Sequence, residues 1–361
     1  MHPRSAYWLP LGVLLALPAC SKEQQHERTS EPAASVDKNA TLDPELARAV
    51  AAASSRAKPT AAPDSSGGPP ANGIFPPGAA DAEIKPGAPP KITLGGTGSE
   101  PRVSLAPAQP KPGWRTQGTF ELQVSSGPQA APIPFEIAVS IEAQKPKSAP
   151  ADAGAPVSDS VAMTAKVLGA KIGVSGIPHD LELAVAKLKG SKVEYQVSPD
   201  GAGSGYHTEV APGAESVRDQ LRQLSDALAL VTLPVPSDPL GTGAYWMATS
   251  REGVFGLDLV TYRLVKVEAV KGDSVTLSVG TKRYATSKRF DFEGLPPDAP
   301  HELSEFQCKS EGKLVLKAGT PFPQSGDLDS GLLASLPLPG QENQAGTLQV
   351  QTHVTLDFAK H

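Results

Sequence analysis

The sequence predicts an α+β fold in which a mostly antiparallel, curved and half-barrel-like β-sheet packs on one amphipathic helix. Three observations support this fold class. Apolar and polar residues alternate in many short runs after residue 112, which is the period of half-buried strands. Residues 216–230 carry apolar side chains at helical spacing instead. A tight Lys-Gly-Asp turn at 271–273 separates two long alternating runs and favours antiparallel pairing.

The predicted strands fall into two groups, and each group opens with a tryptophan that follows a nearby glycine. Trp114 precedes the first group and Trp246 lies at the start of the second, which hints at an internal duplication. The strands predict one β-rich domain over residues 113–361. The alternating runs lie at 120–124, 135–141, 161–167, 193–197, 245–249, 255–270, 274–285, 314–317 and 348–358.

The helical segment at 216–230 has one apolar face. Ser216 suits the N-cap position. Each aliphatic side chain left in water would lose about 1.5–3 kcal/mol of stabilisation. We therefore expect the apolar face to pack into the concave side of the sheet. The face consists of Val217, Leu221, Leu224 and Leu228.

The same leucines would form one wall of any ligand site that the sheet encloses. Trp246 joins them as a candidate because aromatic residues often line ligand pockets, although a plain core tryptophan is the simpler interpretation. The candidate ligand-wall residues are therefore Leu221, Leu224, Leu228 and Trp246.

The N-terminal part of the chain has a different composition. The chain holds 37 Pro and 34 Gly among 361 residues, which is too many for one compact body. Residues 20–112 are rich in Pro, Ala, Gly and Ser and lack sustained alternation. Ordering a backbone costs about 1–2 kcal/mol per residue, and so little apolar area cannot offset that cost. The sequence predicts a disordered tether over residues 20–112.

The first residues have the pattern of an export signal. Arg4 precedes an apolar stretch at 6–17 that is too short to span a bilayer, and Ala19 stands before Cys20. Leu17-Pro18-Ala19-Cys20 resembles the lipobox of bacterial lipoproteins, with Pro18 departing from the usual residue. That resemblance implies cleavage of residues 1–19, acylation of Cys20 with palmitate-type chains, and attachment to the lipid bilayer. The alternative is an ordinary secretory signal in which Cys20 is incidental.

Little in the sequence points to catalysis or to a cofactor. The formal charge of −5 argues against nucleic-acid binding. With only Cys20 and Cys308, the chain has neither a disulfide framework nor a thiolate zinc site. No histidine in the predicted domain has metal-ligand spacing to another His or Cys, and His353 is out of phase with the apolar residues beside it, which predicts that it faces solvent. We predict no catalytic, cofactor-binding or metal-binding residue.

Two further residue patterns have structural interpretations. Cys308 alternates with Phe306, which predicts a buried, inert thiol. Ser310 and Lys313 have the spacing of penicillin-recognising enzymes, but the surrounding residues read as a hairpin, where the two side chains would not share a helix face. We expect this spacing to be a coincidence.

Several short motifs in the second half of the chain resemble a family of uncharacterised bacterial envelope lipoproteins. They are Leu233-Pro234-Val235-Pro236, Gly241-Thr242-Gly243-Ala244-Tyr245-Trp246, Thr261-Tyr262-Arg263-Leu264 and Asp273-Ser274-Val275-Thr276-Leu277. The resemblance covers residues 215–358 and implies no activity. Ser21 after the cysteine resembles the default signal for the outer membrane, on its periplasmic side, rather than the inner membrane or the cell surface.

Three functions are compatible with these patterns. The first is non-catalytic binding of an apolar ligand or an envelope protein partner, because a curved sheet that holds a helix is similar in fold to the half-barrel carriers of lipids and lipoproteins. The second is a structural or assembly accessory with a filled core and no pocket. The third is a hydrolase whose site residues are dispersed along the sequence.

Overall fold

The computed structural model of the chain describes residues 69–106, 110–126, 131–144, 160–254, 256–289, 302–338 and 341–358. The chain divides into two units, Met1–Pro44 and Glu45–His361, and every described residue belongs to the second. The predicted signal peptide, Cys20 and the first part of the tether lie outside the described residues. Within the described ranges, no helix is long and apolar enough to cross a bilayer.

The described strands form one antiparallel sheet in the order β1-β7-β8-β9-β10-β11-β12-β2-β3-β4-β5-β6. Because β1 and β6 stand at its two edges, the sheet is open. The strands are β1 (Lys91–Gly96), β2 (Arg115–Ser126), β3 (Ile133–Ala143), β4 (Val161–Ile172), β5 (Lys192–Val197), β6 (Gly203–Glu209), β7 (Tyr245–Val254), β8 (Leu257–Lys271), β9 (Ser274–Ala285), β10 (Glu305–Lys317), β11 (Ser325–Leu338) and β12 (Gln341–Asp357).

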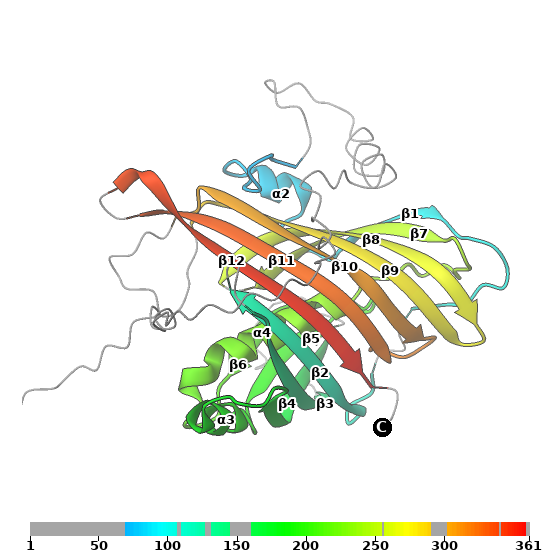
Figure 1. Ribbon diagram of the computed structural model, residues 1–361. Coiled ribbons are helices and arrows are strands. Elements are labelled where there is room, and N and C mark those ends of the chain that lie inside the picture. The colour runs from blue at the N-terminus through cyan, green and yellow to red at the C-terminus, as the bar shows by residue number, and fades with distance from the viewer. Residues whose placement is uncertain are drawn as a thin grey trace, which may run out of the picture. The chain divides into compact units, whose positions relative to one another are not determined.

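Apart from the edge strand β1, the sheet consists of two meanders, β2–β6 and β7–β12. They are joined by the pairing of β12 with β2. Figure 1 shows the long strands β7–β12 side by side, with β2–β5 continuing the sheet beside the helices α3 and α4. The prediction of a mostly antiparallel sheet with few helices is confirmed.

Some predictions for single segments are confirmed and others are wrong. The run at 274–285 is β9, and the predicted tight turn before it is confirmed, since Gly272 has a φ of 63° between paired Lys271 and Ser274. The hairpin expected around 310–313 is wrong, because these residues lie inside β10, paired with both β9 and β11. Gly312 marks close packing there and not a turn, since a Cβ atom would lie 2.1 Å from the Asp327 carbonyl oxygen.

The predicted boundary of the tether at residue 112 is wrong, because residues 69–106 are folded onto the sheet. Strand β1 pairs with β7 and forms one edge of the sheet. Helix α2 (Ala79–Glu83) packs near Val260 of β8. The Arg251 guanidinium binds the Asp81 carboxylate at 2.6 Å and the Ile84 carbonyl at 3.0 Å. The free-energy cost of ordering this backbone is offset by a few apolar residues that are buried against the sheet. They are Ile74, Phe75, Ile84 and Leu105, all buried. Composition alone does not predict these contacts.

Residues 72–75 lie between the ends of β9 and β10 as a short extended segment. Asn72 and Gly73 carbonyls accept hydrogen bonds from the Phe306 and Ala285 amides, and the Phe75 amide donates to the Ala285 carbonyl. Ile74 contacts one face of the sheet and Phe75 the other. Gly73 is required, because its φ is +75° and a Cβ atom would lie 1.5 Å from the Phe306 carbonyl oxygen.

The prediction of one helix is also wrong. Besides α2 and α4 (Arg218–Val231), the described residues contain α3 (His179–Ala186) and a 3₁₀ turn, η1 (Glu215–Val217). His179 therefore begins a helix. Pro178 stands at its N-cap position without a side-chain cap, and Asp180 in the first turn is typical of a helix start. Ser216 lies in η1 and does not cap α4, which starts two residues later without a side-chain cap.

The main core lies between α4 and one face of the sheet, called the inner face here and marked by Leu277, Leu314 and Val354. Leu221, Leu224 and Leu228 are each fully buried in that core, which confirms that the apolar helix face is covered. The opposite, outer face alternates with it along each strand, as β9 illustrates.

Candidate functional site

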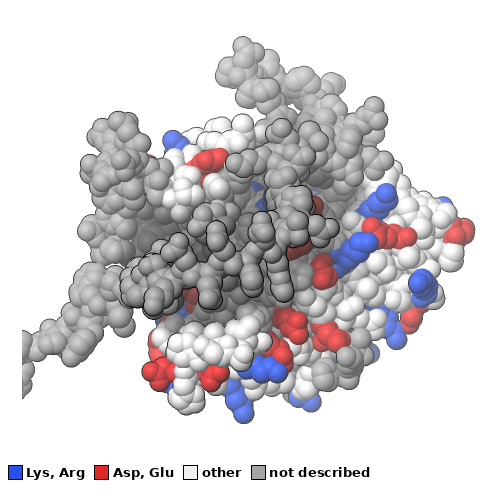
Figure 2. Space-filling model, in the orientation of Figure 1, with Lys and Arg blue, Asp and Glu red and all other residues white. Residues whose placement is uncertain are grey.

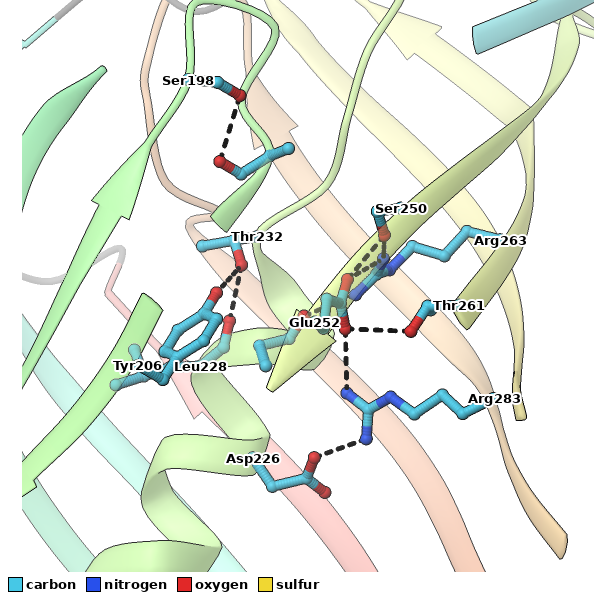
Figure 3. Close-up of polar contacts among 12 residues, drawn as sticks. Ser198, Tyr206, Asp226, Leu228, Thr232, Ser250, Glu252, Thr261, Arg263 and Arg283 are labelled. Atoms are coloured by element: carbon cyan, nitrogen blue, oxygen red, sulfur yellow. Dashed lines mark hydrogen bonds and ion pairs between the residues drawn. The ribbon is translucent and has the colours of Figure 1, made fainter. Parts of the chain in front are cut away.

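A cluster of buried charges lies on the inner face where β7, β8 and β9 meet α4. It contains Asp226, Glu252, Arg263 and Arg283, whose exposed fractions are 6%, 3%, 1% and 2%. Each strand residue holds an inward position in the alternation, so the strands themselves carry the charges into the core. Figure 3 shows both guanidinium groups directed at the carboxylate of Glu252.

Glu252 is the centre of the cluster. Its Oε1 accepts hydrogen bonds from Arg263 at 2.5 Å and from Ser250 at 2.7 Å. Its Oε2 accepts one from Thr261 at 3.1 Å. The second terminal nitrogen of Arg263 donates to the Ala229 carbonyl of α4 at 2.8 Å, so this arginine ties the helix to the sheet.

Arg283 is paired less completely. Its Nη1 binds Asp226 at 2.5 Å, and its Nη2 lies 3.7 Å from the Glu252 carboxylate. The Nε and Nη2 atoms are buried without a hydrogen-bond partner among the described residues. A buried guanidinium with free N–H donors is costly, because each unpaired donor loses its hydration without replacement.

The electrostatics of the cluster keep Glu252 and Arg283 ionised. Burial opposes charge on Glu252, but Arg263 and Arg283 outweigh it and hold the pKa of Glu252 below its ordinary value. Burial also opposes charge on Arg283, yet Asp226 and Glu252 hold its pKa above the ordinary value. Two positive and two negative charges therefore balance inside the core.

Polar side chains continue away from the cluster along the inner face. Arg263 stands opposite Thr281, Thr281 opposite Ser310, and the same row reaches Thr352 through Ser330. The Oγ1 of Thr281 and the Oγ of Ser310 are buried without a hydrogen-bond partner among the described residues. A polar row thus crosses five strands next to α4, whose Gln223 lies 3.3 Å from Thr352.

A groove of about 520 Å³ opens beside Arg283, within the usual volume range of small-molecule sites. Its lining comes from β9–β12 and from residues 69–73, the segment that enters the sheet there. Leu332 and Val350 are half-buried, which leaves apolar surface open to the groove. The lining includes residues from both faces of the sheet. The inward-facing ones are Arg283, Phe306, Cys308, Leu332 and Val350, and the outward-facing ones are Lys282, Tyr284, Gln307, Lys309, Gly331, Leu333, Gln349 and Gln351.

Cys308 lies directly across from Arg283 in the strand register. It is a buried free thiol, as the sequence predicted. Burial raises the pKa of Cys308 to about 11, and the neighbouring Arg283 opposes that rise only in part. The thiol is therefore protonated and a poor nucleophile at neutral pH.

The four predicted ligand-wall residues do not border this groove. Leu221, Leu224, Leu228 and Trp246 are each 0% exposed and belong to the closed core. The indole nitrogen of Trp246 donates to the Pro234 carbonyl at 2.9 Å, which is the environment of a plain core tryptophan.

The strand alternation contains a signal for the charged cluster that the apolar patterns alone do not reveal. Arg263 is in phase with Val265 and Arg283 with Val279, so both arginines were at inward positions of recognised strands. Asp226 lies on α4 and accepts a hydrogen bond from Arg283, although an aspartate in a helix is usually exposed. His353 lies 3.5 Å from Asp327 and 2.9 Å from Asp329 on the outer face, next to the groove-lining pair Gly331 and Gln351.

The part of the surface visible in Figure 2 carries interspersed acidic and basic side chains, with neither sign gathered in a large patch. No protein-family description and no curated protein matches the chain.

Proposed function

We propose that this protein is a non-catalytic binding protein of the bacterial envelope, and that it holds a mainly apolar ligand in the groove beside Arg283. The observation that carries the proposal is an open groove with half-buried Leu332 and Val350, beside a buried guanidinium whose Nε and Nη2 make no hydrogen bond among the described residues. Pockets of this kind, apolar with a few convergent polar groups, are typical of ligand sites.

The charge balance favours an uncharged acceptor on the ligand. Asp226 and Glu252 already neutralise Arg263 and Arg283, so an anion would add an unbalanced charge to a buried region. A carbonyl oxygen, as in an ester or amide, would accept from Arg283 without that penalty once the guanidinium, whose Nε and Nη2 are enclosed in this structure, turns toward the groove. The apolar part of the ligand would then cover Phe306, Leu332 and Val350.

The envelope location rests on the N-terminal sequence. The lipobox-like residues before Cys20 support export and a bilayer anchor, with the outer membrane and its periplasmic side favoured by Ser21. The half-barrel form of the sheet around α4 is part of the same proposal, since carriers of apolar ligands use such folds. A protein partner that inserts an apolar side chain into the groove is the second ligand class.

Nile red, an uncharged dye with a ring carbonyl, tests the proposal with the full-length chain. We expect its fluorescence to rise on binding, and Leu332→Trp to weaken binding at least tenfold by filling the groove. Methyl laurate should displace the dye at lower concentration than dodecane, which has no acceptor.

Leu183→Trp is the matched control, because Leu183 is 49% exposed on α3 and does not line the groove. Its dye affinity should equal that of the unmodified protein. Equal affinities for all three proteins would reject the groove as the site. Equal displacement by methyl laurate and dodecane would reject the role of Arg283 as a donor to the ligand.

A structural accessory role is the second candidate, and one observation favours it. The α4 leucines and Trp246 fill the core completely, and the charge cluster ties α4 to the sheet. Under this alternative, neither the dye nor the lipid ester should bind, while the protein remains stably folded.

A further inference from the structure

A second site lies on the outer face of the sheet, where β11 and β12 pair. Asp327 and Asp329 are two residues apart on β11, so their side chains share that face. His353 stands directly opposite Asp329 in the register, and Thr355 opposite Asp327. Candidate ligand atoms of Asp327, Asp329 and His353 all lie within 4.8 Å of one another.

The two ring nitrogens of His353 have different neighbours. Nδ1 lies 2.9 Å from the Asp329 Oδ1, a hydrogen-bond distance, and Nε2 lies 3.5 Å from the Asp327 Oδ2. When Nδ1–H donates to Asp329, the lone pair of Nε2 points toward a carboxylate oxygen. Thr355 Oγ1 also lies 3.4 Å from Nε2, at the long end of hydrogen-bond distances, and a cation between Nε2 and the Asp327 oxygen would attract both electron-rich atoms.

The distance suits a metal ion. With metal–ligand bonds of about 2.0–2.1 Å, two ligands of a tetrahedral ion are about 3.4 Å apart, close to the 3.5 Å between Nε2 and Oδ2. The carboxylate of Asp329 on Nδ1 matches the carboxylate–histidine–metal arrangement that orients metal-bound histidines. Asp329 would therefore act as a positioning residue, and Asp327 and His353 as ligands.

The neighbouring charged side chains offer Asp327 and Asp329 little positive charge. Lys313 is opposite Asp327, but its Nζ binds Glu268 at 2.8 Å. Glu311 is opposite Asp329, which places two carboxylates in a pairing that is unfavourable by itself. Within the described ranges, the ion pairs of Asp327 and Asp329 involve only His353.

We propose that Asp327 and His353 bind a divalent transition-metal ion such as Zn²⁺, with Asp329 fixing the imidazole. Glu121, opposite Thr355 on the adjacent strand β2, lies on the same face but outside this group of close ligand atoms. Imidazole nitrogen with carboxylate oxygen favours zinc-like ions, whereas calcium prefers oxygen ligands alone. Asp327, Asp329 and His353 do not line the groove beside Arg283, although the groove-lining residues Gly331 and Gln351 form the next cross-strand pair on this face.

Calorimetric titration of the untagged full chain with zinc chloride tests this site. We expect His353→Gln and Asp327→Asn each to remove one equivalent of bound zinc. Asp329→Asn should weaken that equivalent about 10- to 100-fold, the usual effect of losing the group that orients a histidine ligand. Calcium chloride should give no corresponding binding.

Asp238→Asn is the control, since Asp238 is exposed and far along the chain from the site. It should leave the zinc isotherm unchanged, and the metal-free melting temperatures of all four variants should match that of the unmodified protein. A zinc isotherm that is the same with and without His353, or calcium binding as tight as zinc binding, would overturn the proposal.

Discussion

The two meanders of the sheet bury their inner faces with different chemistry. In β2–β6, the fully buried residues are apolar, such as Phe120, Ile137 and Val139. In β7–β12, the same alternation places Glu252, Arg263 and Arg283 at inward positions. Both halves therefore alternate inward and outward residues as half-buried strands do. They differ in whether the inward residues are all apolar or include charged side chains.

The two halves should respond differently to single substitutions. An apolar side chain stabilises the core through its own buried area, so its removal costs about what that area contributes. A buried ion stabilises only while its partner is present, and the partner left alone is worse than neither ion. The charged half is thus held together by interdependent groups, and the apolar half by additive ones.

The largest effect is expected from Glu252→Gln. The substitution keeps the side-chain volume but leaves Arg263 and Arg283 with one carboxylate between them. We expect it to lower the free energy of unfolding by about 3–5 kcal/mol. Urea denaturation followed by circular dichroism measures the change.

Two companion variants sharpen this prediction. Glu142→Gln removes the exposed partner of Arg115 and should cost at most about 1 kcal/mol. Combining Glu252→Gln with Arg263→Met leaves the Arg283–Asp226 pair balanced, so the double variant should be more stable than Glu252→Gln alone. If Glu252→Gln costs no more than Glu142→Gln, the cluster is solvated and the contrast between the halves fails.

A somewhat smaller loss is expected in the apolar region. Leu224→Ala should destabilise the protein by about 2–5 kcal/mol, because Leu224 is fully buried and its removal leaves a cavity. Leu183→Ala, at an exposed position of α3, should change stability by less than about 0.5 kcal/mol. Since Leu224 does not line the groove, Nile red affinity should stay the same; a lower affinity would restore the leucine face as a ligand wall.

Sequence patterns predicted local elements well where apolar residues alternate cleanly. The run at 274–285 coincides with β9, and the runs before residue 200 fall within β2–β5. The alternating patterns do not reveal β11 (Ser325–Leu338). The adjacent Leu332 and Leu333 break the alternation, and Pro337 lies one residue before the end of the strand. The pairing of β12 with β2 joins strands far apart in the chain, and no local pattern encodes it.

The candidate sites were less predictable than the strands. The inward phase of Arg263 and Arg283 could have been read from the sequence, but their partner Asp226 comes from a helix whose rotation depends on packing. The Asp327 and Asp329 spacing was visible too. Its link to His353 depends on the register of β11 against β12, which the sequence does not specify.

The smallest effect concerns Cys308 at alkaline pH. Burial raises the pKa of Cys308 to about 11 in the folded protein, whereas an unfolded thiol titrates near about 8.5. Between these two values the unfolded chain loses its thiol proton while the folded chain keeps it. Stability is therefore full below about pH 8.5 and falls as pH rises toward 11, with a loss of about 1 kcal/mol by about pH 9.5. Urea denaturation at pH 7.5 and 9.5 should show this loss, and Cys308→Ala should remove it. A loss of the same size in Cys308→Ala would show that other groups cause the pH dependence and that burial does not raise the pKa of this thiol.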